Sequence, residues 1–535
     1  MAEKFNRATF TRNFIKKITR IKRPDEMLEQ ASEVSLEKTL GVWDLIILGI
    51  GAIIGSGIFA VVGVAAAGSP DGGVGAGPAL VVSMIIALIA CIFSALCYSE
   101  FATMIPVAGG AYIYTFATLG EFAAWMVGWV LMLEYAVGFI ACACAWSNHF
   151  VQFLSGFSHV LPSWLANPPV WLMNNTSSAL KICKDAGVAD VTTVIPHIAG
   201  IPICINLPAI FMIILTAAIL IKGTKDSAKM AGIMVVIKLA VIALFVLGGA
   251  FYVKPENWTP FAPNGFEGIF AGAFLIFFAY IGFDAVATAA EECKNPQRDL
   301  PIGIIGSLLA TTVVYVLVAL VLTGMQPTSG VTIPADFLKA PMAYAMGAAG
   351  KNFFAGLISA GSLAGLTSVL LVMMMAAIRT LYAMSRDNFI SKRFQKLHPV
   401  FKTPSVLTWT VCGLSIIGVL LLDLNVAAEL SNFGTFASFI VVCIAVLILR
   451  KTEPDRPRPF KVPFSPLFPC LGILCCGGLM VYKMQFASSS GLLFPLWMGI
   501  GALIYLYYGF VKNRNYENEL HNEKVAHKKR QEITK

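Results

Sequence analysis

The sequence predicts an all-α integral membrane protein with 12 transmembrane helices, arranged as a 5+5 inverted repeat with discontinuous helices 1 and 6. Three observations support this fold class. Hydrophobic residues make up 57% of the 535 residues and charged residues 13%, against about 25% charge in an average soluble domain, and the mean hydropathy is +0.76. Many apolar runs are long enough to cross a bilayer, which takes about 20 residues. Two of these runs are interrupted, at residues 49–59 and 277–284.

Apolar runs of about 18 or more residues define the individual spans. They begin near residues 43, 78, 118, 203, 228, 265, 302, 350, 404, 427, 466 and 490. The distribution of basic residues supports these assignments, because loops that stay in the cytoplasm are enriched in Lys and Arg. The chain has 39 Lys and Arg residues. If both termini lie inside, the external loops contain only four of them, Lys181, Lys184, Lys254 and Lys339. The net charge of +9 is therefore mainly a consequence of topology.

We expect a multi-pass protein of the plasma (inner) membrane, with cytoplasmic tails at residues 1–42 and 512–535. Short loops without a long hydrophilic external domain fit a bacterial plasma membrane. The first apolar run starts about forty residues into the chain and is full length, so we do not expect it to be a cleavable signal peptide. The lipid bilayer is then the main environment, and nucleic-acid binding is not expected.

The first span contains the most informative interruption, four glycines and a serine within residues 49–57. Glycine favours a local opening of the helix because its backbone is the most flexible and it has no side chain. The half-helix that resumes near Ser56 would offer free N–H groups to a carboxylate, and the preceding half would offer free C=O groups to an ammonium. The alternative is a face of small residues that packs against ordinary helices.

A milder break at residues 279–282 lies in the sixth span, five spans after the first. We therefore expect two copies of opposite membrane orientation, residues 43–253 and 265–449, followed by two additional spans at residues 466–511. In such inverted repeats the broken first helices face each other near the middle of the membrane and form the binding site.

Five motifs in this order and spacing extend the interpretation to a family. They are Gly-Ile-Gly-Ala-Ile-Ile-Gly-Ser-Gly-Ile-Phe at residues 49–59, Pro-Val-Ala-Gly-Gly-Ala-Tyr at 106–112, Phe-Ala-Tyr-Ile-Gly-Phe-Asp-Ala at 278–285, Glu-Glu-Cys-Lys-Asn-Pro-Gln-Arg-Asp-Leu-Pro at 291–301 and Arg-Thr-Leu-Tyr-Ala-Met-Ser-Arg-Asp at 379–387. Over about residues 38–510 the chain resembles the amino acid-polyamine-organocation (APC) superfamily, in particular bacterial relatives of the cationic amino acid transporter (CAT) family. The resemblance implies the LeuT-like five-plus-five fold of amino acid carriers.

Lys238 lies in the fifth span, in a run of apolar residues too deep for its ammonium to reach either surface easily. Ionisable groups at this depth are costly and are functional candidates. Burial disfavours the charged form and nearby carbonyl or carboxylate groups favour it, so such a lysine can change its protonation as a cavity opens and closes. In the superfamily, a lysine on the fifth helix takes the place of a sodium ion and couples transport to protons, which implies the same role for Lys238. The alternative is a lysine that extends to the surface from a shifted span.

Other buried or bulky residues are candidates for the walls of the site. Glu134 lies in the third span. As a carboxylate it would suit a substrate with a cationic side chain, and when protonated it could donate a hydrogen bond to a neutral substrate. Its alternative role is a structural hydrogen bond to a neighbouring helix. Asp284 either caps the resuming half-helix or has a direct role. Phe278 is the expected gate over the substrate, and Met373 is a candidate for the floor of the side-chain pocket; both could instead be packing residues.

We thus predict a secondary active transporter that carries L-amino acids, cationic or small neutral, together with protons by alternating access. The expected substrate-binding residues are Ile53, Gly55, Ser56, Gly57, Glu134, Phe278, Ala279, Ile281 and Met373, with Lys238 for proton coupling. An exchanger and a non-transporting amino acid sensor of the same fold remain alternatives. A channel would need a continuous pore, and an enzyme or a metal site would need convergent catalytic or ligating groups, whereas the six His are scattered. No cofactor is expected.

Several residues outside the site are candidates for structural roles. Near the inner surface, ion pairs of Asp44, Glu100, Glu291 or Glu292 with Arg379, Arg386 or Lys294 would close the cytoplasmic side. Cys183 and Cys204 flank an external loop and are a candidate disulfide, which spacing alone does not establish. A small accessory membrane protein is a further candidate partner.

Overall fold

The structure of the chain is a computed structural model. It describes residues 18–33, 38, 40–69, 73–107, 109–156, 161–166, 168–185, 188, 190–198, 201–328, 333–401, 403–485 and 490–507. The expected C-terminal tail and the first 17 residues of the expected N-terminal tail lie outside these residues.

The described residues form helices joined by short connections and two minimal antiparallel strand pairs. In the first half these are α2 (Pro24–Glu33), α3 (Val42–Ile53), the π-helical turn η1 (Gly57–Val61), α4 (Val62–Ala67), β1 (Gly68–Ser69), β2 (Gly73–Val74), η2 (Gly77–Ala79), α5 (Leu80–Met104), α6 (Ala111–Thr118), α7 (Glu121–Met132), the π-helical turn η3 (Leu133–Val137), α8 (Gly138–Gly156), α9 (Ser163–Ala166), α10 (Val170–Met173), α11 (Thr176–Asp185), η4 (Val191–Thr193), β3 (His197–Ile198), β4 (Ile201–Pro202), α12 (Leu207–Lys222) and α13 (Thr224–Gly249).

The second half contains helices and turns, and no named strand among its described residues. Its elements are η5 (Ala250–Tyr252), η6 (Pro255–Trp258), α14 (Gly265–Phe277), the 3₁₀ turn η7 (Phe278–Tyr280), α15 (Ala285–Thr288), η8 (Ala290–Glu292), α16 (Pro296–Met325), α17 (Ala335–Lys339), α18 (Pro341–Ala348), α19 (Asn352–Arg386), η9 (Lys392–Gln395), α20 (Ser405–Leu421), α21 (Leu424–Thr452), α22 (Leu467–Gln485) and a last helix, Ser490–Tyr507.

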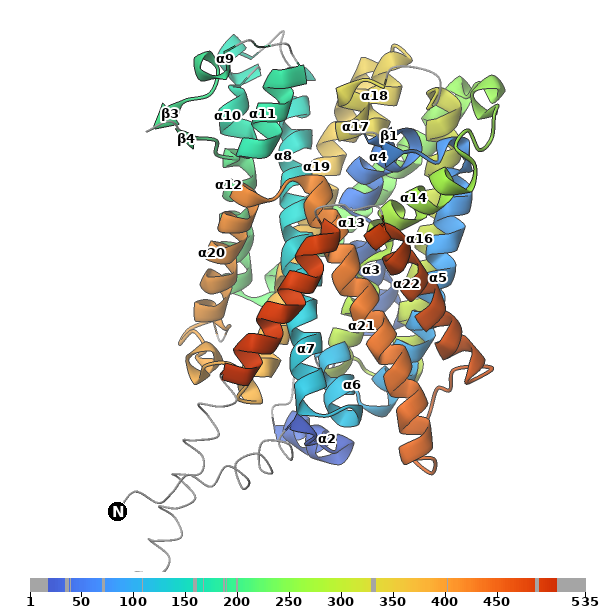
Figure 1. Cartoon of the computed structure of the whole chain (residues 1–535), viewed down its shortest axis with the longest axis vertical. Coiled ribbons are helices and arrows are strands. Elements are labelled where there is room, and N and C mark those ends of the chain that lie inside the picture. The colour runs from blue at the N-terminus through green and yellow to red at the C-terminus, as the bar shows by residue number, and fades with distance from the viewer. Residues whose placement is uncertain are drawn as a thin grey trace, which may run out of the picture.

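The long helices run roughly along the long axis of the molecule (Figure 1). α2 and α6 lie at one end of this bundle, and the short helices α9 to α11 with the β3–β4 pair lie at the opposite end (Figure 1). In the predicted topology, α2 marks the cytoplasmic end and α9 to α11 the external end. Cys183 and Cys204 are both buried in a small hydrophobic cluster of this external part, and their thiols are free.

The described helices agree with a multi-pass membrane protein. Nine of them are long and apolar enough to cross a membrane, and α3 with the segment Gly57–Ala67 makes a tenth when it is counted as one bent span. α12 and α20, with 16 and 17 residues, are shorter apolar helices that reach about 24–26 Å, somewhat less than the roughly 30 Å hydrocarbon core. Helices therefore begin near each predicted position, while the count of twelve spans stays a prediction.

Helices that correspond in the two predicted repeats are similar in length. The span over α7, η3 and α8 (Glu121–Ser155) and the span α19 both have 35 residues, and the two short helices α12 and α20 are the fourth and ninth in order. α8 packs against α19, and α12 packs against α20. These similarities support the predicted repeat without establishing its symmetry.

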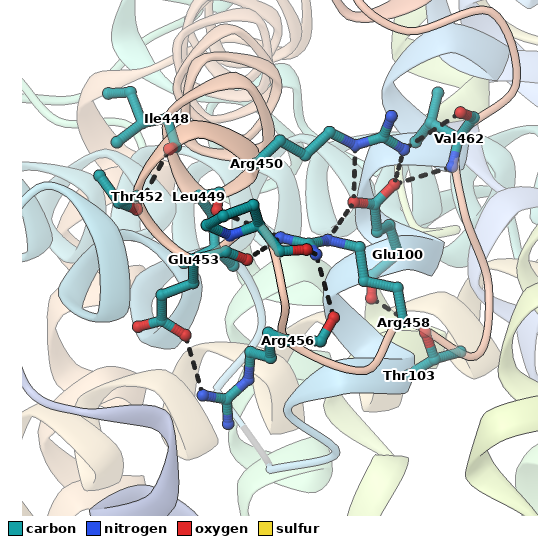
Figure 2. A network of polar contacts seen from close by, with 11 residues as sticks. Glu100, Thr103, Ile448, Leu449, Arg450, Thr452, Glu453, Arg456, Arg458 and Val462 are labelled. Carbon is teal, nitrogen blue, oxygen red and sulfur yellow. Dashed lines mark hydrogen bonds and ion pairs between the residues drawn. The ribbon is translucent and has the colours of Figure 1, made fainter.

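A buried polar network joins α5 to α21 near the end of the bundle where α2 lies. Glu100 is fully buried and accepts hydrogen bonds from Arg450 Nε at 3.0 Å, from Arg450 Nη2 and from the amide of Val462 at 2.7 Å. Arg458 adds an ion pair at 3.4 Å, and Figure 2 shows Glu100 between the two guanidinium groups. The basic partners of Glu100 are thus at the end of α21 and in the following loop. The expectation that Glu100 pairs with Arg379, Arg386 or Lys294 is wrong.

We expect removal of the Glu100 carboxylate to destabilise the protein strongly, because Arg458 would keep a buried charge with fewer partners. Breaking a buried ion pair costs about 3–5 kcal/mol, so Glu100→Ala should lower the free energy of unfolding by about this amount in mixed detergent micelles. Asp25→Asn is the control. Asp25 forms an ion pair with Arg456, but its side chain is 82% exposed, and an exposed ion pair contributes about 0–1 kcal/mol to stability. Equal effects of the two substitutions would contradict this role of Glu100.

Candidate functional site

The first predicted break is present in the structure. α3 ends at Ile53, Ile54 has an extended backbone with ψ 99°, and the helix resumes at Gly57 with a bend of 42°. In the described part of the chain, the amides of Gly55 and Ser56 donate to no backbone carbonyl group, and the Ser56 amide faces the thiol of Cys142. The break therefore presents free N–H groups inside the protein, which is the feature that binds an anion at a helix start.

The second break follows α14. A single 3₁₀ turn, Phe278–Tyr280, leads to Ile281, whose backbone is extended with ψ 135°, and α15 starts at Ala285. Gly282 has φ +121°, and a Cβ there would lie 2.9 Å from the backbone of Ala52. Only glycine fits this combination of left-handed backbone and close approach.

The two breaks contact each other directly. A Cβ on Gly57 would lie 2.3 Å from the Cα of Ala279, so the start of η1 packs on the backbone of η7. The free amides of the first break and the carbonyl groups of the second break are thus held in one place. This arrangement brings together Ile53, Gly55, Ser56, Gly57, Phe278, Ala279 and Ile281.

Tyr315, on α16, links the two breaks and was missed by the sequence analysis. Its hydroxyl lies 3.0 Å from the carbonyl oxygen of Ile53 and 2.7 Å from that of Ala279. A phenol has one proton to donate, so one of the two carbonyl groups always keeps its acceptor capacity free. No sequence signal distinguishes Tyr315 from an ordinary packing aromatic of an apolar span.

Lys238 is fully buried and lies at the end of α3. Its Nζ donates hydrogen bonds to the carbonyl oxygens of Gly51 at 2.6 Å and Ile54 at 2.7 Å and to Ser368 Oγ at 3.1 Å. Gly51 is one of the last four residues of α3, whose carbonyl groups have no partner within the helix, and Ile54 directly follows the helix. The side chain does not extend to the surface, so the alternative of a lysine that reaches the interface does not describe this structure.

α8 and α19 form further walls around the first break. On α19, Val369 contacts Gly55, since a Cβ on that glycine would lie 2.9 Å from Val369 Cγ2. Ser56 Oγ lies 3.1 Å from Cys142 Sγ on α8. Met373, the expected pocket floor, is close to Gly138 at the start of α8.

Glu134 lies on the π-helical turn η3, a type of helix irregularity that is frequent at functional sites. Its Oε2 accepts a hydrogen bond from Ser438 Oγ at 3.0 Å, and its backbone carbonyl accepts one from Ser431 at 2.9 Å. No hydrogen bond joins Glu134 to the first break among the described residues. Its carboxyl instead interacts with Asp284, just after the second break.

Asp284 does not cap the half-helix α15, because its side chain makes no capping hydrogen bond. That expectation is wrong, and the reason is that the carboxylate bonds to the hydroxyl of Tyr135 on η3. Tyr135 was likewise missed, because the contact joins residues that are 149 positions apart.

The side of the site toward α2 is closed by ion pairs. Arg379 Nη2 lies 2.6 Å from Glu292 Oε1, one of the pairs expected from the sequence. Lys22 Nζ lies 2.7 Å from Asp387, which also accepts a hydrogen bond from Tyr112 at 2.7 Å. Asp44 instead accepts a hydrogen bond from the amide of Gly41 at 2.9 Å.

The predicted site residues are buried as a group, so this conformation is closed toward both ends. Among those with a side chain, none is more than 5% exposed, and Phe278 is 4% exposed: Ile53, Ser56, Glu134, Lys238, Phe278, Ala279, Ile281 and Met373. No group of three or more metal-ligating side chains occurs among the described residues. The arrangement offers hydrogen-bonding groups for a small ligand with an anionic and a cationic end.

Comparison with known proteins identifies the family. Residues 40–511 match the family model described as "Amino acid permease". The chain belongs to the amino acid permease family. This membership confirms the resemblance to APC transporters related to the CAT family, and it makes the chain a multi-pass membrane permease.

The names of three relatives of this permease state different substrates. The methylthioribose transporter of Bacillus subtilis (strain 168) is 40% identical over 489 residues, which cover 91% of this chain and 97% of that protein. The branched-chain amino acid permease BcaP of the same organism is 41% identical over 486 residues, 90% of this chain and 96% of the relative. The chloroplastic cationic amino acid transporter 9 of Arabidopsis thaliana is 33% identical over 473 residues, 88% and 77% of the two chains.

We expect Gly57→Ala to force the two breaks apart, because the added methyl group would overlap the backbone of Ala279. Overpacking of this kind costs about 1–3 kcal/mol, which a thermal unfolding experiment in detergent detects as a lower midpoint. Gly413→Ala on α20 is the matched control, since nothing lies within 4 Å of a Cβ there and alanine favours a helix by about 1 kcal/mol over glycine. A Gly57→Ala protein as stable as the Gly413→Ala protein would contradict the contact.

Proposed function

We propose that this permease carries L-amino acids across the membrane together with protons, by alternating access. The observation that supports this most is the contact between the two breaks, which holds the free amides of Gly55 and Ser56 beside the carbonyl groups of η7. An amino acid is a zwitterion, and a broken helix pair offers a partner for each of its charged ends.

In the proposed binding mode, the amides at Gly55, Ser56 and Gly57 hold the substrate carboxylate. The carbonyl groups of Ile53, Phe278, Ala279 and Ile281 hold its ammonium. Tyr315 sets the separation of the two breaks, and the carbonyl group to which it is not donating is free for the ammonium. Charge-assisted hydrogen bonds at both ends select the zwitterion over an uncharged analogue.

Lys238 is the proposed proton-coupling residue. A protonated ammonium has three hydrogens to donate, and Gly51, Ile54 and Ser368 supply three acceptors within 3.1 Å. Loss of the proton would leave a neutral amine with two hydrogens and remove the charge that binds the last carbonyl groups of α3. The position of α3 therefore depends on protonation, and the substrate amides directly follow α3.

The proposed cycle moves one set of helices against the other. The predicted repeats, residues 43–253 and 265–449, provide a bundle of spans 1, 2, 6 and 7 and a scaffold formed by the remaining spans. Phe278 closes the site on the external side, and Glu292–Arg379 and Lys22–Asp387 close it on the α2 side. We also propose that the chain lies in the plasma membrane with both termini in the cytoplasm. A small accessory membrane protein is a further proposed partner.

The proposed substrates are cationic or small neutral L-amino acids. Glu134 supports a cationic side chain, and Met373 supports an apolar one. The names of relatives add branched-chain amino acids and methylthioribose as substrates to compare. An exchanger of the same fold would need an amino acid on the opposite side of the membrane, and a sensor would bind without accumulation.

Uptake into proteoliposomes tests the proposal. Labelled arginine, lysine, alanine, leucine and methylthioribose are offered with and without an inward proton gradient. We expect saturable accumulation of at least one amino acid, increased by the gradient. Gradient-independent uptake that requires amino acid inside the vesicle would identify an exchanger, and saturable binding without accumulation would identify a sensor.

Lys238→Ala tests proton coupling separately. We expect its gradient-driven uptake to fall at least tenfold at equal protein level, because the group that binds α3 is lost. Lys254→Ala, at an exposed position, is the matched control and should retain gradient-driven uptake. Uptake by Lys238→Ala that the proton gradient still increases would overturn the assignment.

A further inference from the structure

Two buried carboxyl groups, those of Glu134 and Asp284, interact with each other inside the helix bundle. Both residues are at most 1% exposed. Glu134 belongs to the third span and Asp284 to the broken sixth span, so the contact joins a scaffold element to a bundle element in the proposed cycle. We call these two groups the carboxyl pair.

The groups that face the carboxyl pair carry no positive charge. They are hydroxyl and thiol groups on α5, α6, η3 and α21, namely Cys91, Tyr98, Tyr114, Tyr135, Thr435 and Ser438. Within the described part of the chain, no Lys, Arg or His forms an ion pair with either carboxyl. Lys238 bonds to the first break, and Arg379 on α19 bonds to Glu292.

Each carboxyl group has one oxygen with a partner and one without. Ser438 donates to Glu134 Oε2 and Tyr135 donates to Asp284 Oδ2. Glu134 Oε1 and Asp284 Oδ1 are buried and have no hydrogen-bond partner among the described residues, and the hydroxyl groups of Tyr98 and Tyr114 also lack one. Tyr135, the residue after Glu134, hydrogen-bonds to Asp284, so the two carboxyl groups with unpaired acceptors belong to one cluster, which points to a missing donor.

Electrostatics makes two ionised carboxylates at this place unfavourable. A buried polar group without a partner is costly, and two like charges close together in a protein interior repel each other more strongly than in water. One proton corrects both defects, because it removes one charge and supplies the missing donor. Neighbouring carboxyl groups commonly share a proton for this reason.

We propose that Glu134 and Asp284 together bind one proton, held mainly on Glu134, at a proton site separate from Lys238. The proton is assigned to Glu134 because Asp284 has more donors around it: the Tyr135 hydroxyl bonds to it, and the amides of Gly282 and Ala285 face it. The side chain of Glu134, in contrast, accepts a hydrogen bond from the hydroxyl group of Ser438 and has no backbone amide facing it in the same way among the described residues.

The consequence for transport rests on the proposed function. The shared proton holds the inner half of the sixth span against the third span. Loss of the proton leaves two negative charges in contact, and their repulsion separates the two spans. Each broken helix then has its own proton-binding group, Lys238 at the first break and the carboxyl pair at the second.

Infrared difference spectroscopy on the full chain in lipid bilayers tests the proton site without any transport measurement. At neutral pH the wild-type protein should show the C=O stretching band of one protonated carboxyl, which shifts in D₂O. Glu134→Gln should remove this band. Glu429→Gln is the control, because Glu429 forms an ion pair with Lys483 at 2.6 Å; this variant should retain the band.

A wild-type spectrum without such a band, or a Glu134→Gln spectrum that retains it, would overturn the proposal. If Glu134→Gln does not fold, Asp284→Asn decides, because the band of Glu134 should remain and change position when its charged neighbour is replaced by an amide. A band at an unchanged position would overturn the pairing. Since the readout is spectroscopic, its failure is distinct from a failure of the transport proposal.

Discussion

The whole arrangement depends on how the protein satisfies the backbone groups that appear when a helix is interrupted inside a membrane. Lipid cannot bond to free N–H and C=O groups, and each of them is costly there. In this permease, the carbonyl groups at the end of α3 bind Lys238, and those of Ile53 and Ala279 share Tyr315. The amides of Gly55 and Ser56 have no backbone carbonyl partner among the described residues, and in the proposed function they bind the substrate carboxylate.

Buried charged groups of the described residues lie both at the breaks and at the end of the bundle near α2. Lys238 contacts the first break, and Asp284 follows the second break and interacts with Glu134. Farther toward α2, Glu100 has two arginine partners and Glu292 pairs with Arg379. In the proposed function the buried charges of the centre respond to protons and substrate, whereas Glu100 and Glu292 at the end of the bundle have basic partners.

Sequence reasoning located the features that have a local signature. Glycines that interrupt an apolar run predicted the bend at residues 54–56, and the depth of Lys238 in its span predicted a buried ammonium. Tertiary partners had no such signature. Tyr315 and Tyr135 look like ordinary aromatics of apolar spans, and nothing in the sequence indicates that Glu100 meets Arg450, 350 positions away. For Asp284 the sequence left a local cap and a direct role open, and the structure gives its carboxylate a partner on a distant helix, Tyr135.

An experimentally determined structure with a transported amino acid bound, in a lipid bilayer, tests the central claim most directly. The account predicts density for the substrate carboxylate at the amides of Gly55 and Ser56, with the ammonium at the carbonyl groups of the second break. Substrate density away from both breaks, or first and sixth spans that continue as uninterrupted helices, would contradict it.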